Sequence, residues 1–215
     1  MMKNNRFKLI ISTIVILLPI LVGLILWDKL PEQVPTHWGI DGNPDGWSSK
    51  ASAVFAMPCI LLAVHWLAMF ANSNEKISGK QNPRVMGIVF WLVPVVSLVV
   101  NGMMYAYALG REVDVMFILP SALGLMLIII GNYLPKCRQS KTVGIRVKWT
   151  LEDEENWNAT HRFGGKVWVA AGFLAIACVF LPDFLIPWVP FAITFAAGAV
   201  PIVYSYLYYR KYRNK

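Results

Sequence analysis

The sequence is poor in charged residues and in cysteine, and both shortages restrict the kind of protein it encodes. Only 15% of its 215 residues are charged, whereas 57% are hydrophobic. That proportion is too apolar for an ordinary soluble domain of this length and indicates a membrane protein. The three cysteines, Cys59, Cys137 and Cys178, form no CxxC pair. This pattern predicts unpaired thiols, with neither a disulfide framework nor a zinc site.

Charged residues are missing from the middle of the long apolar runs. A helix needs about 20 apolar residues to cross a bilayer core of roughly 30 Å. Six segments meet or approach this length, at residues 9–27, 51–71, 85–109, 115–134, 167–181 and 184–207. The fifth is short, and it could begin earlier, across residues 163–165. The sequence therefore predicts an all-α bundle of six transmembrane helices, forming a single integral membrane domain over residues 1–215.

The positive charge is spread over short segments between these runs. The net charge is +8, but no single amphipathic face carries it, so we expect no direct binding to nucleic acid. Of the 20 Lys and Arg residues, three precede the first run, three lie at 72–84, seven at 135–166 and four in the C-terminal tail. Since cytoplasmic loops are enriched in these residues, we expect both termini in the cytoplasm and residues 28–50 and 110–114 outside. Membrane lipid is then the surrounding partner.

Polar residues away from the ends of the runs are few: His65, Ser97, Asn101, Ser121 and Thr194, with Asn132 near the end of the fourth run. They include no Ser/His pair, no paired Asp and no HExxH motif, and a proton or ion pathway would need more than they offer. We therefore expect no catalytic residue, no cofactor and no enzyme activity. His65 and Asn101 are expected to form hydrogen bonds between helices, and lining a cavity is the alternative.

Small residues recur at helical spacing in two runs. Gly124 and Gly131 are one heptad apart, and Ala192 and Ala196 are four residues apart. Either pair could let two helices approach closely.

The most structured polar segment runs from residue 131 to 166. Residues 150–153, Thr-Leu-Glu-Asp, resemble a capping box with Asp in place of Glu or Gln. We predict a short helix over 151–161 that could continue into the fifth run. Its acidic first turn, residues 152–155, lies close in sequence to Arg146, Lys148 and Arg162. Local ion pairs are the favoured interpretation, and a docking surface for a cytoplasmic partner is the alternative.

The predicted outer segment contains a possible calcium motif. Asp41, Asn43, Asp45 and Gly46 fit the start of an EF-hand loop, but the twelfth position is Ser52 rather than the required Glu. Asp-Gly and Asn-Pro dipeptides explain the segment as turns. We therefore predict an ordered cap without a metal.

Two blocks of motifs carry a family resemblance. The first comprises Leu30-Pro31, Val34-Pro35, His37, Gly42, Pro44-Asp45-Gly46 and Ser49-Lys50. The second comprises Gly131-Asn132, Pro135, Gly144, Arg146, Trp149-Thr150-Leu151, Trp157, Thr160-His161-Arg162 and Gly164-Gly165-Lys166. With these blocks the chain resembles the SdpI family of bacterial membrane proteins, whose N-terminal part often carries a signature similar to the first block. One departure is Val147-Lys148, where the family usually has Thr-Pro.

This resemblance implies a multi-pass protein of the bacterial cytoplasmic membrane that gives immunity to a secreted killing peptide. It also implies a receptor that holds a transcriptional repressor at the membrane. Peptide binding would fall to the outer residues Pro31, Pro35, His37, Gly42, Pro44, Asp45, Gly46 and Lys50. Repressor docking would fall to the cytoplasmic residues Asn132, Pro135, Gly144, Arg146, Trp149, Thr150, Leu151, Trp157, His161 and Arg162. The alternatives are a small transporter or channel and, less favoured, a membrane enzyme that uses His161.

Overall fold

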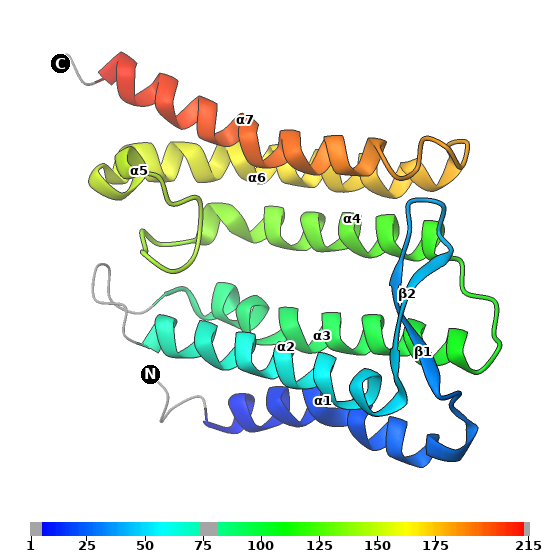
Figure 1. The fold of residues 1–215 in the computed structure, drawn as a ribbon. Helices are drawn as coiled ribbons and strands as arrows, with labels where there is room; N and C mark the ends of the chain where they lie inside the picture. The colour runs from blue at the N-terminus through cyan, green and yellow to red at the C-terminus, as the bar shows by residue number, and fades with distance from the viewer. Residues whose placement is uncertain (1–5, 74–80, 213–215) are drawn as a thin grey trace. The chain divides into compact units, whose positions relative to one another are not determined.

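The computed structural model describes residues 6–73 and 81–212 and is mainly helical (Figure 1). Its long helices are α1 (Arg6–Ile25), α2 (Lys50–Ser73), α3 (Pro83–Ala108), α4 (Val115–Tyr133), α6 (Glu154–Ala177) and α7 (Val189–Tyr212). In the described part of the chain, these six helices are long and apolar enough to cross a membrane. The prediction of an all-α protein with six spans is therefore confirmed.

Shorter elements connect the long helices. They are the 3-10 turns η2 (Trp27–Lys29), η3 (Leu134–Lys136) and η4 (Cys178–Phe180), the strands β1 (Gln33–Trp38) and β2 (Pro44–Ser49), and the helix α5 (Lys148–Glu152). By their contacts the elements divide into two compact units. The first contains α1, β1, β2, α2 and most of α3, and the second contains the first turn of α3 together with α4 to α7.

The fifth span begins earlier than its apolar run. The helix α6 starts at Glu154, because the carboxylate of Asp153 caps it by accepting a hydrogen bond from the Glu155 N–H at 2.9 Å. The prediction that a helix crosses residues 164–165 into the fifth span is confirmed. The prediction that Thr150 caps it is wrong. Thr150 lies inside α5, where its hydroxyl oxygen accepts the Val147 N–H at 3.1 Å.

Polar side chains on α3 bind the backbone of α1 in the first unit. Ser97 donates a hydrogen bond to the Ile16 carbonyl at 3.1 Å, and two turns later Tyr105 donates to the Pro19 carbonyl at 2.9 Å. Asn101 lies between them, but its side-chain amide donates to the Ser97 carbonyl within α3. The expected bond from Asn101 to another helix is therefore not the one formed.

His65 joins α2 to α1 in the same unit. It is fully buried, and its Nε2 lies 2.9 Å from the Ser12 hydroxyl oxygen. Because the Ser12 hydroxyl donates to the Leu9 carbonyl at 3.0 Å, the ring N–H is the donor to Ser12. The interhelical role predicted for His65 is confirmed.

Glycines bring α4 and α6 into backbone contact in the second unit. A Cβ atom added to Gly124 would lie 2.5 Å from the Gly172 carbonyl oxygen, and one added to Gly131 would lie 2.9 Å from the Gly165 carbonyl oxygen. The close approach predicted from Gly124 and Gly131 is thus confirmed, and its partners are a second glycine pair at the same spacing. Ala192 and Ala196, the other predicted pair, are exposed on α7 instead.

The helices α6 and α7 run antiparallel, and three contacts fix their register. The Trp168 indole donates to the Ala197 carbonyl at 2.9 Å, and the Asn156 amide donates to the Ser205 carbonyl at 3.0 Å. Between them, Gly164 packs against Pro201, whose Cβ would lie 3.2 Å from a Cβ at the glycine.

We expect Gly124→Ala to destabilise the second unit by about 1–3 kcal/mol, because the new methyl group meets a backbone oxygen that cannot move aside. Gly198→Ala is the matched control, since nothing lies within 4 Å of a Cβ at this glycine of α7. The midpoint of thermal unfolding in detergent measures the difference. Equal midpoints for the two variants would contradict the close helix contact.

Candidate functional site

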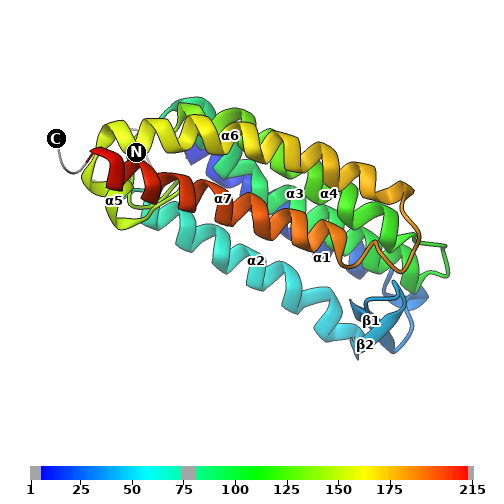
Figure 2. The same cartoon turned by 90° about the horizontal axis from the view of Figure 1, so that it is seen from above.

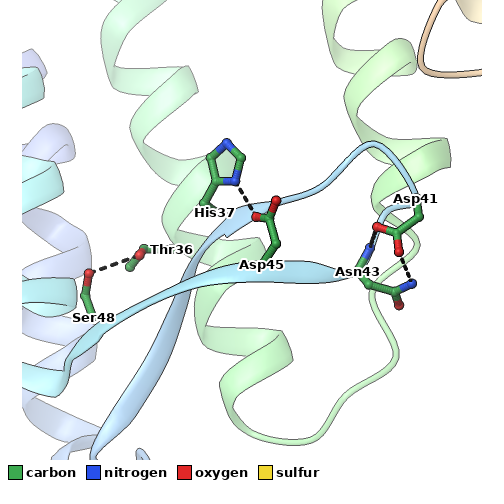
Figure 3. Close-up of polar contacts among 6 residues, drawn as sticks. All are labelled: Thr36, His37, Asp41, Asn43, Asp45 and Ser48. Atoms are coloured by element: carbon green, nitrogen blue, oxygen red, sulfur yellow. Dashed lines mark hydrogen bonds and ion pairs between the residues drawn. The ribbon is translucent and has the colours of Figure 1, made fainter.

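The outer segment predicted as turns is a β-hairpin. The strands β1 and β2 pair antiparallel, with Val34 opposite Ser48 and His37 opposite Gly46. At the tip, the Asp41 carboxylate accepts hydrogen bonds from the Asn43 N–H at 3.1 Å and the Asn43 side-chain amide at 2.9 Å (Figure 3). These bonds hold the pKa of Asp41 below its usual value.

Two side-chain pairs link the strands of the hairpin. His37 Nδ1 bonds the Asp45 carboxylate, and the Thr36 and Ser48 hydroxyls lie 3.0 Å apart (Figure 3). The side chains of His37 and Asp45 are 73% and 54% exposed. A Cβ at Gly46 would lie 2.8 Å from the Cβ of His37, so the glycine makes room for this pair.

The base of the hairpin is anchored to the helices of the first unit. Lys50, at the start of α2, bonds Glu32 at 3.0 Å and donates to the carbonyls of Trp27 and Leu30 at 3.3 and 3.4 Å. Val34 is fully buried, and Figure 2 shows the strands at the N-terminal end of α2. The hairpin is therefore a fixed platform rather than a loose loop.

The predicted outer residues have different positions in this platform. Pro35 is buried and Lys50 anchors the base, whereas Pro31, His37 and Asp45 are exposed. Gly42 has a φ of 76° in the turn, and Pro44 opens β2. In residues 6–73 and 81–212, no three His, Cys, Asp or Glu side chains gather as a metal site.

Sequence reasoning found the turn but missed both strands. Pro35 and Pro44 lie inside them, and proline argues against a strand unless it lies at an edge. A two-stranded hairpin consists only of edges, so it tolerates both prolines.

A buried His–Trp pair holds the loop between α4 and α6, residues 134–153. The rings of Trp157 and His161 are stacked, with centroids 4.0 Å apart. The Trp157 indole donates to the Cys137 carbonyl at 2.9 Å, and burial raises the pKa of the Cys137 thiol to about 11. His161 Nδ1 lies 2.8 Å from the Trp157 carbonyl oxygen, and Nε2 accepts the Ile145 N–H at 3.0 Å.

These contacts use both ring nitrogens of His161. Nε2 accepts an amide N–H and is therefore unprotonated, which leaves Nδ1 as the donor to a carbonyl. Gly144 has a φ of 116°, and a Cβ there would lie 2.5 Å from His161 Nε2. The histidine that the enzyme alternative would use is instead a clamp on the loop backbone.

The loop is also fastened to α7. The Trp149 indole donates to the Ser205 hydroxyl at 2.6 Å, and its ring lies against Tyr206 and Tyr209. Asn156 also bonds α7, because its side-chain amide donates to the Ser205 carbonyl. The Thr160 hydroxyl donates to the side-chain oxygen of Asn156. These partners on α7 could not be predicted from the sequence, because they lie far from the loop in the chain and no motif around them indicates the contact.

The ion pairs predicted in this loop are not formed. Within the described ranges, no oxygen of the acidic residues 152–155 lies within 4.0 Å of a nitrogen of Arg146, Lys148 or Arg162. Arg146 donates instead to the Lys141 carbonyl at 2.7 Å. Glu152, Glu154 and Glu155 are exposed, and so are the three cations. The prediction of local ion pairs is therefore wrong.

The predicted cytoplasmic residues fall into two groups. Gly144, Trp149, Thr150, Leu151, Trp157 and His161 build the loop, with Leu151 half-buried against Trp157. Pro135 and Arg146 are exposed on the loop, whereas Asn132 is exposed on α4 and Arg162 is exposed on α6.

These features define a multi-pass membrane protein with two ordered polar segments. A model of the SdpI/YfhL protein family matches residues 136–205, and a domain of unknown function (DUF1648) matches residues 14–62. The chain is similar to the immunity protein SdpI of Bacillus subtilis (strain 168), with 29% identity over 211 residues, 98% of either chain. Comparison with solved structures gave no significant match.

We expect His161→Phe to loosen the loop by about 1–3 kcal/mol, because phenylalanine keeps the ring stack but leaves the Ile145 N–H without an acceptor. Trypsin, which cuts after Arg138, Lys141 and Arg146, should cleave the variant faster than the parent protein. Asn158→Ala, an exposed change on the same helix, is the control. Cleavage rates that match the control would contradict the clamp.

Proposed function

We propose that this protein is a membrane immunity protein that protects its cell from a secreted peptide. The observation that carries the proposal is the similarity to the immunity protein SdpI over nearly the full length of both chains. The two motif blocks support it, because each forms an ordered polar structure at the ends of the helices. The distribution of Lys and Arg favours an outer hairpin and a cytoplasmic loop at 134–153.

The peptide contact is proposed to lie on the hairpin. Trp47 and Ile40 are 53% and 67% exposed, and the His37–Asp45 pair lies exposed beside them. Residues 28–50 contain four carboxylates and two lysines, in a chain whose net charge is +8. Exposed apolar side chains on a rigid, acidic platform suit an amphipathic, cationic peptide.

Expression of the protein should rescue a sensitive bacterium from such a peptide. Cells with Trp47→Ser should survive only doses at least tenfold lower than cells with the parent protein. The loss follows because an exposed tryptophan on a rigid platform is a typical binding anchor. Trp188→Ser is the matched control, because Trp188 is 60% exposed but lies outside the hairpin. Survival curves at increasing peptide dose give the measurement. If cells with the parent protein die at the same doses as cells without it, the immunity proposal fails.

A second role is proposed for the cytoplasmic loop, as the place where a transcriptional repressor is held. What supports it is the set of exposed charges, including Arg146, Glu154 and Glu155, that form no ion pairs within the described residues. Such charges leave a surface open to a partner with the complementary pattern. The Val147-Lys148 departure lies beside it, at the N-terminus of α5.

Glu154→Lys should reduce retention of the repressor at the membrane and leave protection against the peptide unchanged. The readout is the membrane fraction of a fluorescently labelled candidate repressor in cells exposed to the peptide. Glu112→Lys makes the same charge change at an exposed site in the first unit and should retain the repressor. Equal retention in the two variants would place the repressor contact elsewhere.

A further inference from the structure

The second motif block ends in Thr-His-Arg-Phe-Gly-Gly-Lys, residues 160–166, and α6 divides this stretch between two faces. The buried face carries Thr160, His161, Gly164 and Gly165. These four residues contact the loop, α4 or α7, and these packing contacts explain their place in the motif. Arg162 and Lys166 are exposed and lie one turn apart on the opposite side. Neither helix packing nor the loop clamp uses these two cations.

The register between α6 and α7 shows which part of α7 lies at the same height along the helix axis as Arg162 and Lys166. Contacts at Trp168–Ala197 and Asn156–Ser205 bracket Arg162 and Lys166. Between Ala197 and Ser205, α7 exposes three apolar side chains, Val200, Ile202 and Val203, which are 42%, 41% and 56% exposed. The two exposed cations therefore lie at the same height along the helices as apolar side chains that are suited to hydrocarbon.

The length of the apolar stretch places the same two residues at a membrane boundary. From residue 167 to 180, α6 and η4 contain 14 residues without a charge. At about 1.5 Å per residue this stretch spans roughly 21 Å, which is short of the roughly 30 Å hydrocarbon core. Either the bilayer thins locally, so that its phosphate layer reaches Arg162 and Lys166, or both cationic side chains extend to the phosphate layer.

Helix geometry directs both side chains toward that layer. Cα–Cβ bonds tilt toward the N-terminus of a helix, and the N-terminal turn of α6 is the polar end, with Glu154 and Glu155. Long cationic side chains can place their heads in the polar layer while their stems cover apolar surface. Phe163 stacks on Tyr204 at 4.3 Å beside Arg162, and aromatic rings are common at this depth.

We propose that Arg162 and Lys166 bind the phosphate group of an anionic phospholipid. In the described ranges, neither side chain forms an ion pair or a hydrogen bond with another residue. An unpaired cation beside hydrocarbon is costly, and a lipid phosphate removes that cost for both. The guanidinium offers a planar fork for two phosphate oxygens, and the ammonium adds a point charge one turn deeper. The site stands independently of the immunity proposal, because it uses neither the hairpin nor the loop surface.

The test uses the full chain in nanodiscs of phosphatidylcholine, with and without phosphatidylglycerol. Phosphatidylglycerol should raise the unfolding temperature of the parent protein and remain bound in native mass spectrometry. The double variant R162Q/K166Q should lose both effects, whereas R162K/K166R should keep most of them. The control K29Q/R111Q removes the same charge from exposed sites in the first unit and should behave as the parent. If the double variant does not fold, the single variants R162Q and K166Q replace it, and each should release part of the lipid.

Three results would overturn the proposal. The first is retention of phosphatidylglycerol by R162Q/K166Q at the level of the parent protein. The second is an equal stabilisation by inorganic phosphate in phosphatidylcholine alone, which would make the ligand a free anion. The third is a change of oligomeric state in the double variant, without any effect of phosphatidylglycerol on the parent, which would assign the cations to a contact between two copies of the chain.

Discussion

The backbone contact between α4 and α6 is the constraint on which the second unit depends. Because Gly124 and Gly131 meet Gly172 and Gly165 without intervening side chains, the two helices approach at two points one heptad apart. Their register is thereby fixed, and the N-terminal turns of α6 lie beside the loop that follows α4. The clamp formed by Trp157 and His161 can reach the loop only because the helices are this close.

The first unit orders its polar segment in another way. A two-stranded hairpin is marginally stable by itself, so its conformation depends on the residues that attach it. Val34 is buried among the helices, and Lys50 bonds two carbonyls at the end of the preceding helical segment as well as Glu32. With the base fixed, the strands expose Trp47 and the His37–Asp45 pair, and the turn between them exposes Ile40. Rigidity at one end and exposure at the other are the properties that a binding platform needs, because little freedom remains to be lost on binding.

The sequence predicts the six spans and the family blocks, because apolar run length and short turn dipeptides are local properties of the chain. The glycine contact was also predictable in part, since Gly124 and Gly131 repeat at heptad spacing. The partners Gly165 and Gly172, and the bonds from Trp149 and Asn156 to Ser205, were not predictable, because they join segments far apart in the chain. The predicted ion pairs failed because closeness in sequence is not closeness in space. Arg146 donates to the Lys141 carbonyl instead, and Arg162 lies seven residues after Glu155 on α6, about 10 Å along the helix axis.

The second motif block contains buried residues that shape the loop and exposed charges that the fold does not use. Gly144, Thr150, Trp157 and His161 contact one another or nearby backbone groups, so substitution there changes the shape of the loop before it changes any contact with a partner. Loss of function at these positions is then ambiguous, because it reports folding as readily as binding. The exposed charges are different, since removing one leaves the buried hydrogen bonds intact. The residues of this block that can distinguish a lipid from a protein partner are therefore the few that the fold itself does not use.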